Sequence, residues 1–569
     1  YAFYNCSSFT SINLPSHIMT LGNFSFASCN GITTLTIPET LKTVGSHSFA
    51  NCKMLTGSID FKGQAFGEYM FAGCDGIESL TIQDSITEIP NGAFYNCNKL
   101  ADVTFQGSFR KIGSYAFYSC SALKNIEFKS TESIGDYAFY KCTTLSEIIL
   151  PESLTSVGTH VFAECSTLRK VTLNNTVLGK YMFYKCVTLG GYDKSENKAL
   201  NPIIFAEDTT VIPGWCFAYC HELSEVKYPS SLQLIEDYAF YECNMYLKEV
   251  KLPDGCEVLG EHAFQQCTSL TTIYLSASME TIKSYAFYGC INIQEIVVPQ
   301  GVKIVSDYAF AECYELTTIK IPSSVTYIGR GALYGCVKLE SIFLPFVGAY
   351  KGGSRDDASL FGYIFGGLND TYIAADGSIN NMTYVQSNAS SFWQFEQRYY
   401  NVRSFDSNFA PIAITEEDEG KELHSTLYYV PKTLKTVNIT NETVFGYGAF
   451  MNCDWLQNFY YHYIDYSDYN FAGNYSAIPD EQVTTITKID DYAFFNMGGL
   501  LGSSFQRNGN KQTSAIALYD EVSTNNTYGF FGTEEYIGDY AFALIDNENF
   551  INLVLPASLT YIGKYSFSN

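Results

Sequence analysis

Residues 137–158 read YAFYKCTTLSEIILPESLTSVG, and this stretch returns along the chain with small changes. A phenylalanine stands three residues before Cys142, and Leu145 stands three residues after it. Ile148 and Leu150 lie two positions apart just before a proline, which is the pattern of a brief β-strand. A turn that ends in Val-Gly follows, and the next repeat then begins. We therefore predict that each repeat forms one brief strand, before the proline, and two turns.

Cysteine marks the period of this repeat, because sixteen cysteines fall mostly 22 to 24 residues apart. A unit of this size cannot enclose its own apolar face, so neighbouring units must stack. We expect a leucine-rich-repeat solenoid of about 19 coils of about 23 residues, with a parallel β-sheet on one face. Segments such as 284–290 (SYAFYGC) are too short for stable helices, so we expect single helical or 3-10 turns on the other face.

The pattern C-x2-L-x2-I-x-L-P, with YAF upstream, resembles the BspA-like class of leucine-rich repeats of bacterial and protist surface proteins. The match covers about residues 1–345 and resumes over about 427–569, where Met497 and Ile545 occupy the cysteine column. The resemblance implies an extracellular or cell-surface location. It also implies a role in adhesion, with extracellular-matrix proteins among the ligands of relatives.

Three parts follow from the regularity of the repeat. Residues 1–345 hold regular repeats, residues 346–426 form an aromatic and acidic interruption, and residues 427–569 hold degenerate repeats with long loops. We interpret the interruption as a decorated repeat rather than a separate enzyme domain. A shorter polar insertion, residues 190–202, is expected to form a loop before the strand returns at Ile203.

The charge of the chain restricts its partners. Lys plus Arg number 34 against 59 Asp plus Glu, which gives a formal net charge of −25. Such a surface repels phosphate backbones and anionic lipids. No apolar run approaches the roughly 18 residues that span a bilayer. We therefore expect no nucleic-acid partner and no direct membrane insertion within this segment.

The cysteines are expected to form a structural ladder of free thiols inside the array. They form no C-x2-C pair, and the spacing places one thiol on each coil, where a small apolar side chain packs well. A disulfide framework is typical of small domains that lack a core, which this chain does not. The clearest members of the ladder are Cys97, Cys120, Cys142, Cys165, Cys243, Cys267, Cys290 and Cys313.

The histidines do not indicate catalysis or a metal site. His47, His160 and His262 occupy the tyrosine column of the repeat, so they are interpreted as repeat variants. No H-E-x-x-H, G-x-S-x-G, phosphate-binding-loop or EF-hand pattern is present. We expect no enzymatic activity, no cofactor and no bound metal.

The outward side of the strands is the candidate binding face. Residues two apart on a strand point the same way, so Glu225 pairs with Lys227 and Glu249 pairs with Lys251. On the later strands, the outward-facing position between the two core residues is apolar in three of four repeats. An exposed apolar strip of this kind is typical of a partner site. The alternative is that the interruption folds back and covers this strip, and on either interpretation Phe343 is covered. The strip comprises Tyr274, Val297, Lys320 and Phe343.

Asn-x-Ser/Thr sequons would permit glycosylation in a secreting eukaryote. The candidates are Asn174, Asn369, Asn388, Asn441, Asn474 and Asn525.

These features predict a binding scaffold of the adhesin type that recognises a protein or glycan ligand, with extracellular-matrix proteins suggested by the resemblance. The alternative is a structural subunit of a surface filament, sheath or layer, which self-associates through solenoid ends and loops.

Overall fold

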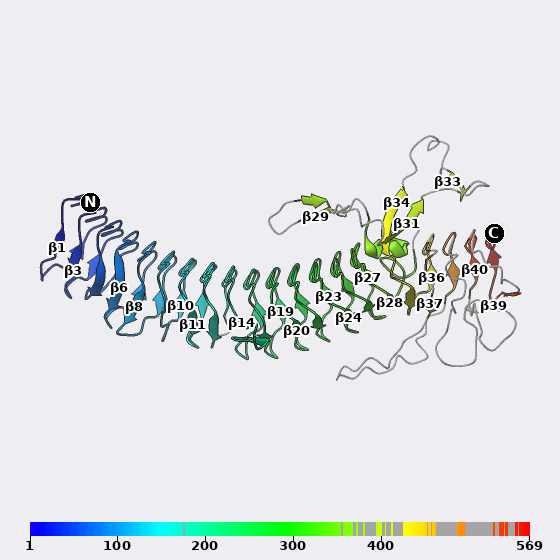
Figure 1. Cartoon of the computed structure of the whole chain (residues 1–569), viewed down its shortest axis with the longest axis horizontal. Coiled ribbons are helices and arrows are strands. Elements are labelled where there is room, and N and C mark those ends of the chain that lie inside the picture. The colour runs from blue at the N-terminus through cyan, green and yellow to red at the C-terminus, as the bar shows by residue number, and fades with distance from the viewer. Residues whose placement is uncertain are drawn as a thin grey trace. The chain divides into compact units, whose positions relative to one another are not determined.

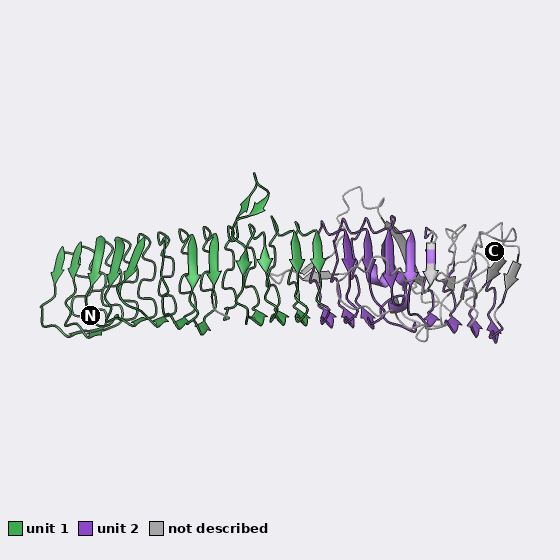
Figure 2. Cartoon of the chain, turned by 90° about the horizontal axis from the view of Figure 1, so that it is seen from below, with its two compact units in different colours: residues 1–276 green, residues 277–569 purple. Residues whose placement is uncertain are grey.

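The computed structural model describes residues 1–174, 177–353, 357–367, 371–373, 379–381, 394–400, 404–405, 411–412, 425–451, 453, 455–456, 458–461, 486–495, 527–529, 534–539, 541–543, 552–555 and 557–568. Over these residues the chain is a parallel β-solenoid of about 18 turns, close to the expected number. It divides into two compact units, Tyr1–Ser276 and Ala277–Asn569 (Figure 2). The three parts defined above by the regularity of the repeat, with boundaries at residues 345 and 426, do not coincide with these units and stay a prediction.

Most coils contribute two strands, as the coil that begins at Tyr137 illustrates. Strand β11 (Glu147–Leu150) pairs in parallel with β13 (Lys170–Leu173) of the next coil. Strand β12 (Ser156–Val157) pairs with β10 (Ser133–Ile134) of the preceding coil. Ile148 and Leu150 point inward and are buried, which confirms the strand predicted from their alternation. We call the β11-like elements face strands and the β12-like elements short strands (Figure 1).

The strands of the first unit fall into these two rows. Its face strands are β1 (Ser11–Asn13), β3 (Thr34–Thr36), β5 (Gly57–Phe61), β6 (Ile77–Ile82), β8 (Asp102–Phe105), β11, β13, β16 (Ile203–Ile204), β18 (Val226–Lys227), β20 (Glu249–Lys251) and β22 (Thr272–Tyr274). Its short strands are β2 (Thr20–Leu21), β4 (Thr43–Val44), β7 (Glu88–Ile89), β9 (Lys111–Ile112), β10, β12, β17 (Val211–Ile212), β19 (Leu234–Ile235) and β21 (Val258–Leu259).

The second unit repeats the arrangement. Its face strands are β24 (Glu295–Val297), β26 (Thr318–Lys320), β28 (Ser341–Leu344), β35 (Thr436–Ile439), β37 (Asn458–Tyr461), β39 (Thr527–Gly529) and β41 (Asn552–Val554). Its short strands are β23 (Thr281–Ile282), β25 (Ile304–Val305), β27 (Tyr327–Ile328), β36 (Val444–Phe445), β38 (Lys488–Ile489), β40 (Tyr536–Ile537) and β42 (Tyr561–Ile562).

Elements outside the two rows occur in both units. The first unit carries the antiparallel pair β14 (Tyr192–Asp193) and β15 (Lys198–Ala199). The second unit carries the antiparallel pairs β29 (Thr371–Ile373) with β30 (Ile379–Asn381), β31 (Gln394–Tyr400) with β34 (Ser425–Pro431), and β32 (Ser404–Phe405) with β33 (Pro411–Ile412), and two 3-10 helices, η1 (Asp357–Ser359) and η2 (Phe361–Phe365).

The segment between tyrosine and cysteine is not helical, which corrects the expected helical or 3-10 turn. Tyr137 and Lys141 have positive φ angles of 55° and 59°. Alternate amides therefore point along the array, and the N–H groups of Tyr137 and Phe139 donate to carbonyl oxygens of the next coil at 2.9 Å. The amides between them close turns within the coil, as when Cys142 N–H donates to the Phe139 carbonyl at 3.2 Å. Hydrogen bonding between coils thus replaces the helix, and it offsets the roughly 1–2 kcal/mol that each left-handed residue costs.

A glycine closes the turn after many short strands because the coils approach one another closely there. A Cβ atom on Gly158 would lie 2.5 Å from both the backbone nitrogen and the Oδ1 atom of Asp136 in the preceding coil. Asp136 Oδ1 in turn accepts a hydrogen bond from Thr159 N–H at 2.7 Å. The glycine of the Val-Gly pair is therefore required because the preceding coil leaves no room for a side chain.

The core consists of ladders of identical side chains. Phe94, Phe117 and Phe139 stack with ring centroids 5.3 Å and 5.2 Å apart, and all three are fully buried. Beside this ladder, most coils up to residue 336 add a buried cysteine. Repetition of one residue per coil thus produces a continuous core from units that could not fold alone.

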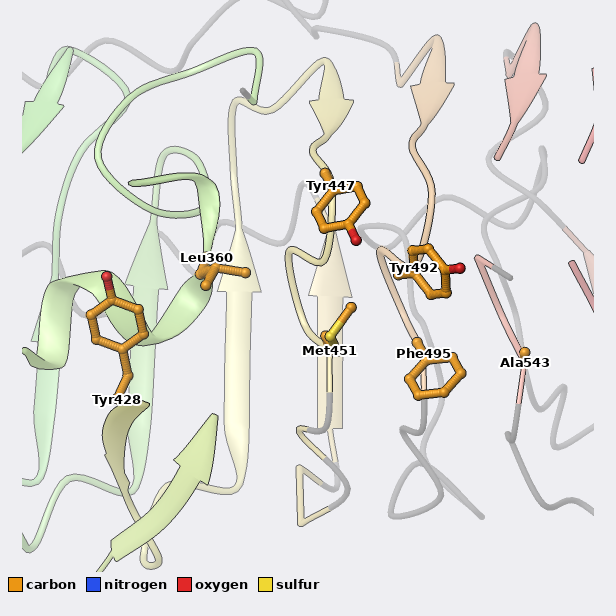
Figure 3. Packing of buried hydrophobic residues seen from close by; sticks show 7 residues of the cluster. All are labelled: Leu360, Tyr428, Tyr447, Met451, Tyr492, Phe495 and Ala543. Carbon is orange, nitrogen blue, oxygen red and sulfur yellow. The ribbon is translucent and has the colours of Figure 1, made fainter. Parts of the chain in front are cut away.

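The interruption is built into the array of the second unit. Strand β28 pairs directly with β35, so the face strands continue across the intervening residues. Helix η2 fills the position of a repeat turn, because Leu333 N–H donates to Ile364 O at 2.8 Å and Phe361 N–H donates to Ala449 O at 2.9 Å. Figure 3 shows the buried cluster beside this helix, formed by Leu360, Tyr428, Tyr447, Met451, Tyr492, Phe495 and Ala543.

Candidate functional site

The outward side of the face strands carries exposed side chains in the first unit. Ile149, Ile204 and Tyr274 are 53%, 52% and 37% exposed, and Ile149 and Ile204 each stand beside buried core residues of the same coil. Strands β16 and β18 pair so that Ile204 lies beside Lys227, and strands β20 and β22 pair so that Lys251 lies beside Tyr274. Large apolar side chains on a regular strand surface contribute nothing to the core, so they are available to a partner.

The charged residues predicted on this face of the first unit lie on strands β18 and β20 or, for Glu225, directly before β18. Lys227 Nζ lies 3.5 Å from Glu225 Oε1. Lys251 Nζ lies 6.0 Å from the ring centroid of Tyr274, within the range of a cation–π contact. Glu249 is exposed on the same strand as Lys251. The structure therefore brings the five predicted residues of this unit together on one surface.

The second unit does not present the exposed apolar strip that its sequence suggested. Lys320 is only 8% exposed, and Val297 and Phe343 are half-buried. The Lys320 ammonium lies 3.2 Å from Glu295 Oε1 and 5.9 Å from the Phe343 ring centroid. Phe343 has a neighbour on each side, Lys320 and Asn438, because β35 continues the sheet. Of the two alternatives left open for this strip, its half-buried and buried side chains fit the covered one, because residues of adjacent coils pack around Lys320 and Phe343.

A second feature of the candidate face was missed in the sequence. Residues 190–202 form a structured hairpin, β14–β15, and not the expected loop. Asp193 Oδ1 accepts hydrogen bonds from the backbone N–H groups of Ser195 and Glu196 at 2.8 Å and 3.2 Å, which fixes the turn. The Ser195 hydroxyl donates to the same oxygen at 2.6 Å, and this hydrogen bond, followed by those from the two backbone N–H groups, lowers the pKa of the Asp193 carboxyl group. The signals that could have indicated it are the Gly-Gly pair at the start and the Asp-x-Ser turn.

The histidines of the tyrosine column pack as members of an aromatic ladder. His160 stacks between Tyr137 and Tyr181, with ring centroids 4.5 Å and 4.3 Å apart. Burial lowers the pKa of His160, and it also lowers the pKa of His47 and of His262. Among the described residues, no three His, Cys, Asp or Glu side chains gather in a way that could hold a metal ion.

The buried thiols donate hydrogen bonds to backbone carbonyls. Cys120 Sγ lies 3.1 Å from the carbonyl oxygen of Phe94 in the preceding coil, and Cys142 Sγ lies 3.3 Å from that of Phe117. Burial raises the pKa of Cys120 to about 12, so its thiolate is scarce at neutral pH. The same contact with a phenylalanine carbonyl is made by Cys97, Cys165, Cys243, Cys267 and Cys313, and Cys290 is likewise buried.

The sequons differ in their accessibility. Asn174 is exposed, whereas Asn441 is half-buried. Asn441 Oδ1 accepts a hydrogen bond from Lys351 Nζ at 3.0 Å, and its Nδ2 group donates to the Ser323 carbonyl at 3.3 Å. The remaining candidates lie outside the described residues, and they are Asn369, Asn388, Asn474 and Asn525.

No helix in the described ranges has both the length and the apolar character that a membrane-spanning segment requires.

Known proteins that resemble the chain are repeat proteins. The Bacteroides ovatus leucine-rich-repeat protein is 28% identical, with 60% of this chain and 75% of that chain covered and a TM-score of 0.42. A leucine-rich cell-surface protein of Faecalibacterium prausnitzii is 30% identical, with 50% and 82% covered and a TM-score of 0.33. The pneumococcal vaccine antigen PcpA is 20% identical, with 55% and 68% covered and a TM-score of 0.30. A search of the curated proteins finds no match.

The sequence also matches the family described as BspA type leucine-rich repeat region, six copies. The matched residues are 1–75, 64–190, 195–290, 243–348, 403–516 and 535–569. These ranges cover most of the chain, and they contain the coils whose ladders of phenylalanine and cysteine form the core. The chain belongs to the BspA-type leucine-rich-repeat family.

Proposed function

We propose that the protein is a non-catalytic binding scaffold of the adhesin type, located outside the cell or on its surface. Its ligand is a protein or a glycan, and extracellular-matrix proteins are the first class to test. The observation that carries the proposal is the exposed row of outward side chains on the face strands of the first unit, where Ile149, Ile204 and Tyr274 are 37–53% exposed.

Two further observations support this function. Leucine-rich-repeat folds generally mediate protein binding. Several titratable side chains of the described coils are committed to packing, because His160 lies inside a ring stack and burial raises the pKa values of Cys120 and Cys165. A regular surface of exposed side chains on a rigid array can recognise a partner by complementarity of shape and charge.

A solid-phase binding assay tests the proposal. The full chain is applied to immobilised collagen, laminin, fibronectin, fibrinogen and a glycan array, and any ligand is then tested against the double variant I204S/Y274S. We expect weaker binding with nearly unchanged thermal stability, because both side chains lie outside the core. The control is the double variant T36S/T104S, which changes outward positions on β3 and β8, two strands that lie well before Ile204 in the sequence. This variant should bind as tightly as the parent does.

Either of two outcomes would refute the proposal. One is the absence of any ligand in the panel. The other is equal binding by the parent and the I204S/Y274S variant.

A further inference from the structure

One buried carboxyl group in the second unit fastens the loop 347–352 to the coil that contains β35. The carboxyl group belongs to Glu442, which is 1% exposed. Its Oε2 atom accepts a hydrogen bond from Val347 N–H at 3.2 Å, and its Oε1 atom accepts one from Gly352 N–H at 2.9 Å. Two backbone N–H groups of its own coil donate to Oε1 at 2.8 Å and 3.3 Å. Segments about 90 positions apart in the sequence are therefore held together by a single side chain.

This attachment places a lysine of the loop against an asparagine of the coil. Lys351 Nζ donates to Asn441 Oδ1 at 3.0 Å, and Asn441 Nδ2 donates to the Ser323 carbonyl at 3.3 Å, so the amide has one orientation. The loop also packs closely on the coil, because a Cβ atom on Gly353 would lie 2.6 Å from the Gly446 Cα atom. An amine and an amide carbon that a packed backbone holds together have the proximity that intramolecular reactions require.

The electrostatic surroundings favour the neutral amine. Although the Lys351 residue is exposed, partial burial of its ammonium group lowers its pKa, while the nearby Glu442 carboxylate acts in the opposite direction. Burial raises the pKa of Glu442, although four backbone N–H groups that bond to it oppose this shift. Both shifts make proton transfer from the ammonium group to the carboxylate easier. The amine that remains is the nucleophilic form of lysine.

We propose that Lys351 and Asn441 join through an isopeptide bond that forms without a cofactor. The Lys351 Nζ atom attacks the Asn441 Cγ atom, the bond between Cγ and Nδ2 breaks, and Nδ2 leaves as ammonia. A lysine ammonium group and a primary amide thus become a secondary amide and an ammonium ion, so atoms and charge balance without an oxidant or a reductant. Glu442 is the positioning residue, because it holds Gly352 and with it the amine. The bond closes residues 351–441 into a covalent loop, a property separate from the binding function.

Mass spectrometry of the full chain tests the inference. The parent should lack one ammonia, about 17 Da, relative to the mass that its sequence requires. Its tryptic digest should contain a branched peptide that joins residues 339–355 to residues 436–488. The variants K351R, which keeps the positive charge, and N441S, which removes the amide, should each have the full mass of their own sequences. Both should fold, because Lys351 is exposed and Asn441 is half-buried.

The first unit supplies a matched control within the same molecule. Lys248 Nζ donates to Asn197 Oδ1 at 3.1 Å, nearly the distance found for Lys351 and Asn441. The carboxylate next to this asparagine belongs to Glu196, which is exposed, whereas Glu442 is buried. Lys248 and Asn197 should therefore stay unlinked in the same digest. A branched peptide from this pair as well would overturn the requirement for the buried carboxyl group.

Two variants of Glu442 test its role. E442Q removes the negative charge and should leave Lys351 and Asn441 unlinked, whereas E442D keeps the charge and should restore part of the bond. An equal loss of the bond in both variants would assign Glu442 to packing alone. A parent with the full sequence mass, a glycan on Asn441, or a deficit of ammonia that persists in K351R would overturn the inference as a whole.

Discussion

Replacing Phe117 with leucine should weaken the array locally, because Phe117 packs between two other phenylalanine rings. Its ring centroid lies 5.3 Å from that of Phe94 and 5.2 Å from that of Phe139, and the side chain is fully buried. Each aromatic pair contributes about 0.5–1.5 kcal/mol beyond area burial, so the loss of both pairs should cost about 1–3 kcal/mol. Leucine fits the position, since Leu333 occupies it in another coil and is buried there.

Hydrogen exchange is the appropriate assay, because long repeat arrays do not unfold in one cooperative step. The amides of Phe117 and Phe139 donate to the carbonyls of Ala138 and Val161 at 2.8 Å and 2.9 Å, so they report the opening of this part of the array. A cost of about 1–3 kcal/mol should accelerate their exchange by about 5- to 150-fold. Mass spectrometry of peptides from residues 111–145 measures this rate.

A double-mutant cycle provides the control. F117L and F139L change neighbouring rings and should couple by about 0.5–1.5 kcal/mol. F117L and F162L change rings two coils apart and should add within about 0.3–0.5 kcal/mol. Equal coupling in the two cycles, or unchanged exchange in F117L, would refute the idea that contacts between adjacent rings stabilise the array.

Three other predictions follow from the described contacts. Burial raises the pKa values of Cys120 and Cys165 to about 12, so iodoacetamide should label the buried thiols only after denaturation. Intact mass measures the labelling, and rapid labelling of several thiols in the native protein would contradict this prediction. Burial lowers the pKa of His160 in the folded state, so the unfolded chain binds this proton more readily and stability should fall as the pH drops below about 6.5. The H160Y variant keeps the ring stack and should show a smaller loss of thermal stability on acidification, whereas an identical pH dependence would exclude this role of His160. If the protein is instead a structural subunit, light scattering and negative-stain imaging should show filaments or sheets without added ligand, and a monomer at all concentrations would argue against assembly.

The repeat could be predicted from the sequence because each coil repeats the same inward residues. The alternation of Ile148 and Leu150 predicted strand β11, and the column that contains Cys142 predicted the ladder of buried thiols. The helical turns were wrong, because hydrogen bonds to the next coil and not the local sequence decide the conformation of Tyr137 and its neighbours.

The binding face was only partly predictable. Glu249 and Lys251 lie outward because the period of two fixes the direction of a side chain on a strand. The burial of Lys320 depends on Glu295 and Phe343 in adjacent coils, which the local sequence does not reveal. The hairpin was missed because a short polar insertion shows no alternation, and Tyr246, which packs on Tyr192, lies 54 positions further along the chain.

By itself, the sequence determined the repeat, its period, the direction of the strands' side chains and the identity of the core columns, because those properties recur in every coil and depend on neighbours that are copies of one another. Only the tertiary structure decided the non-helical turns, the direct pairing of β28 with β35 and the position of the hairpin beside the face strands. These depend on contacts between residues that differ from coil to coil and are distant in the sequence, where periodicity carries no information.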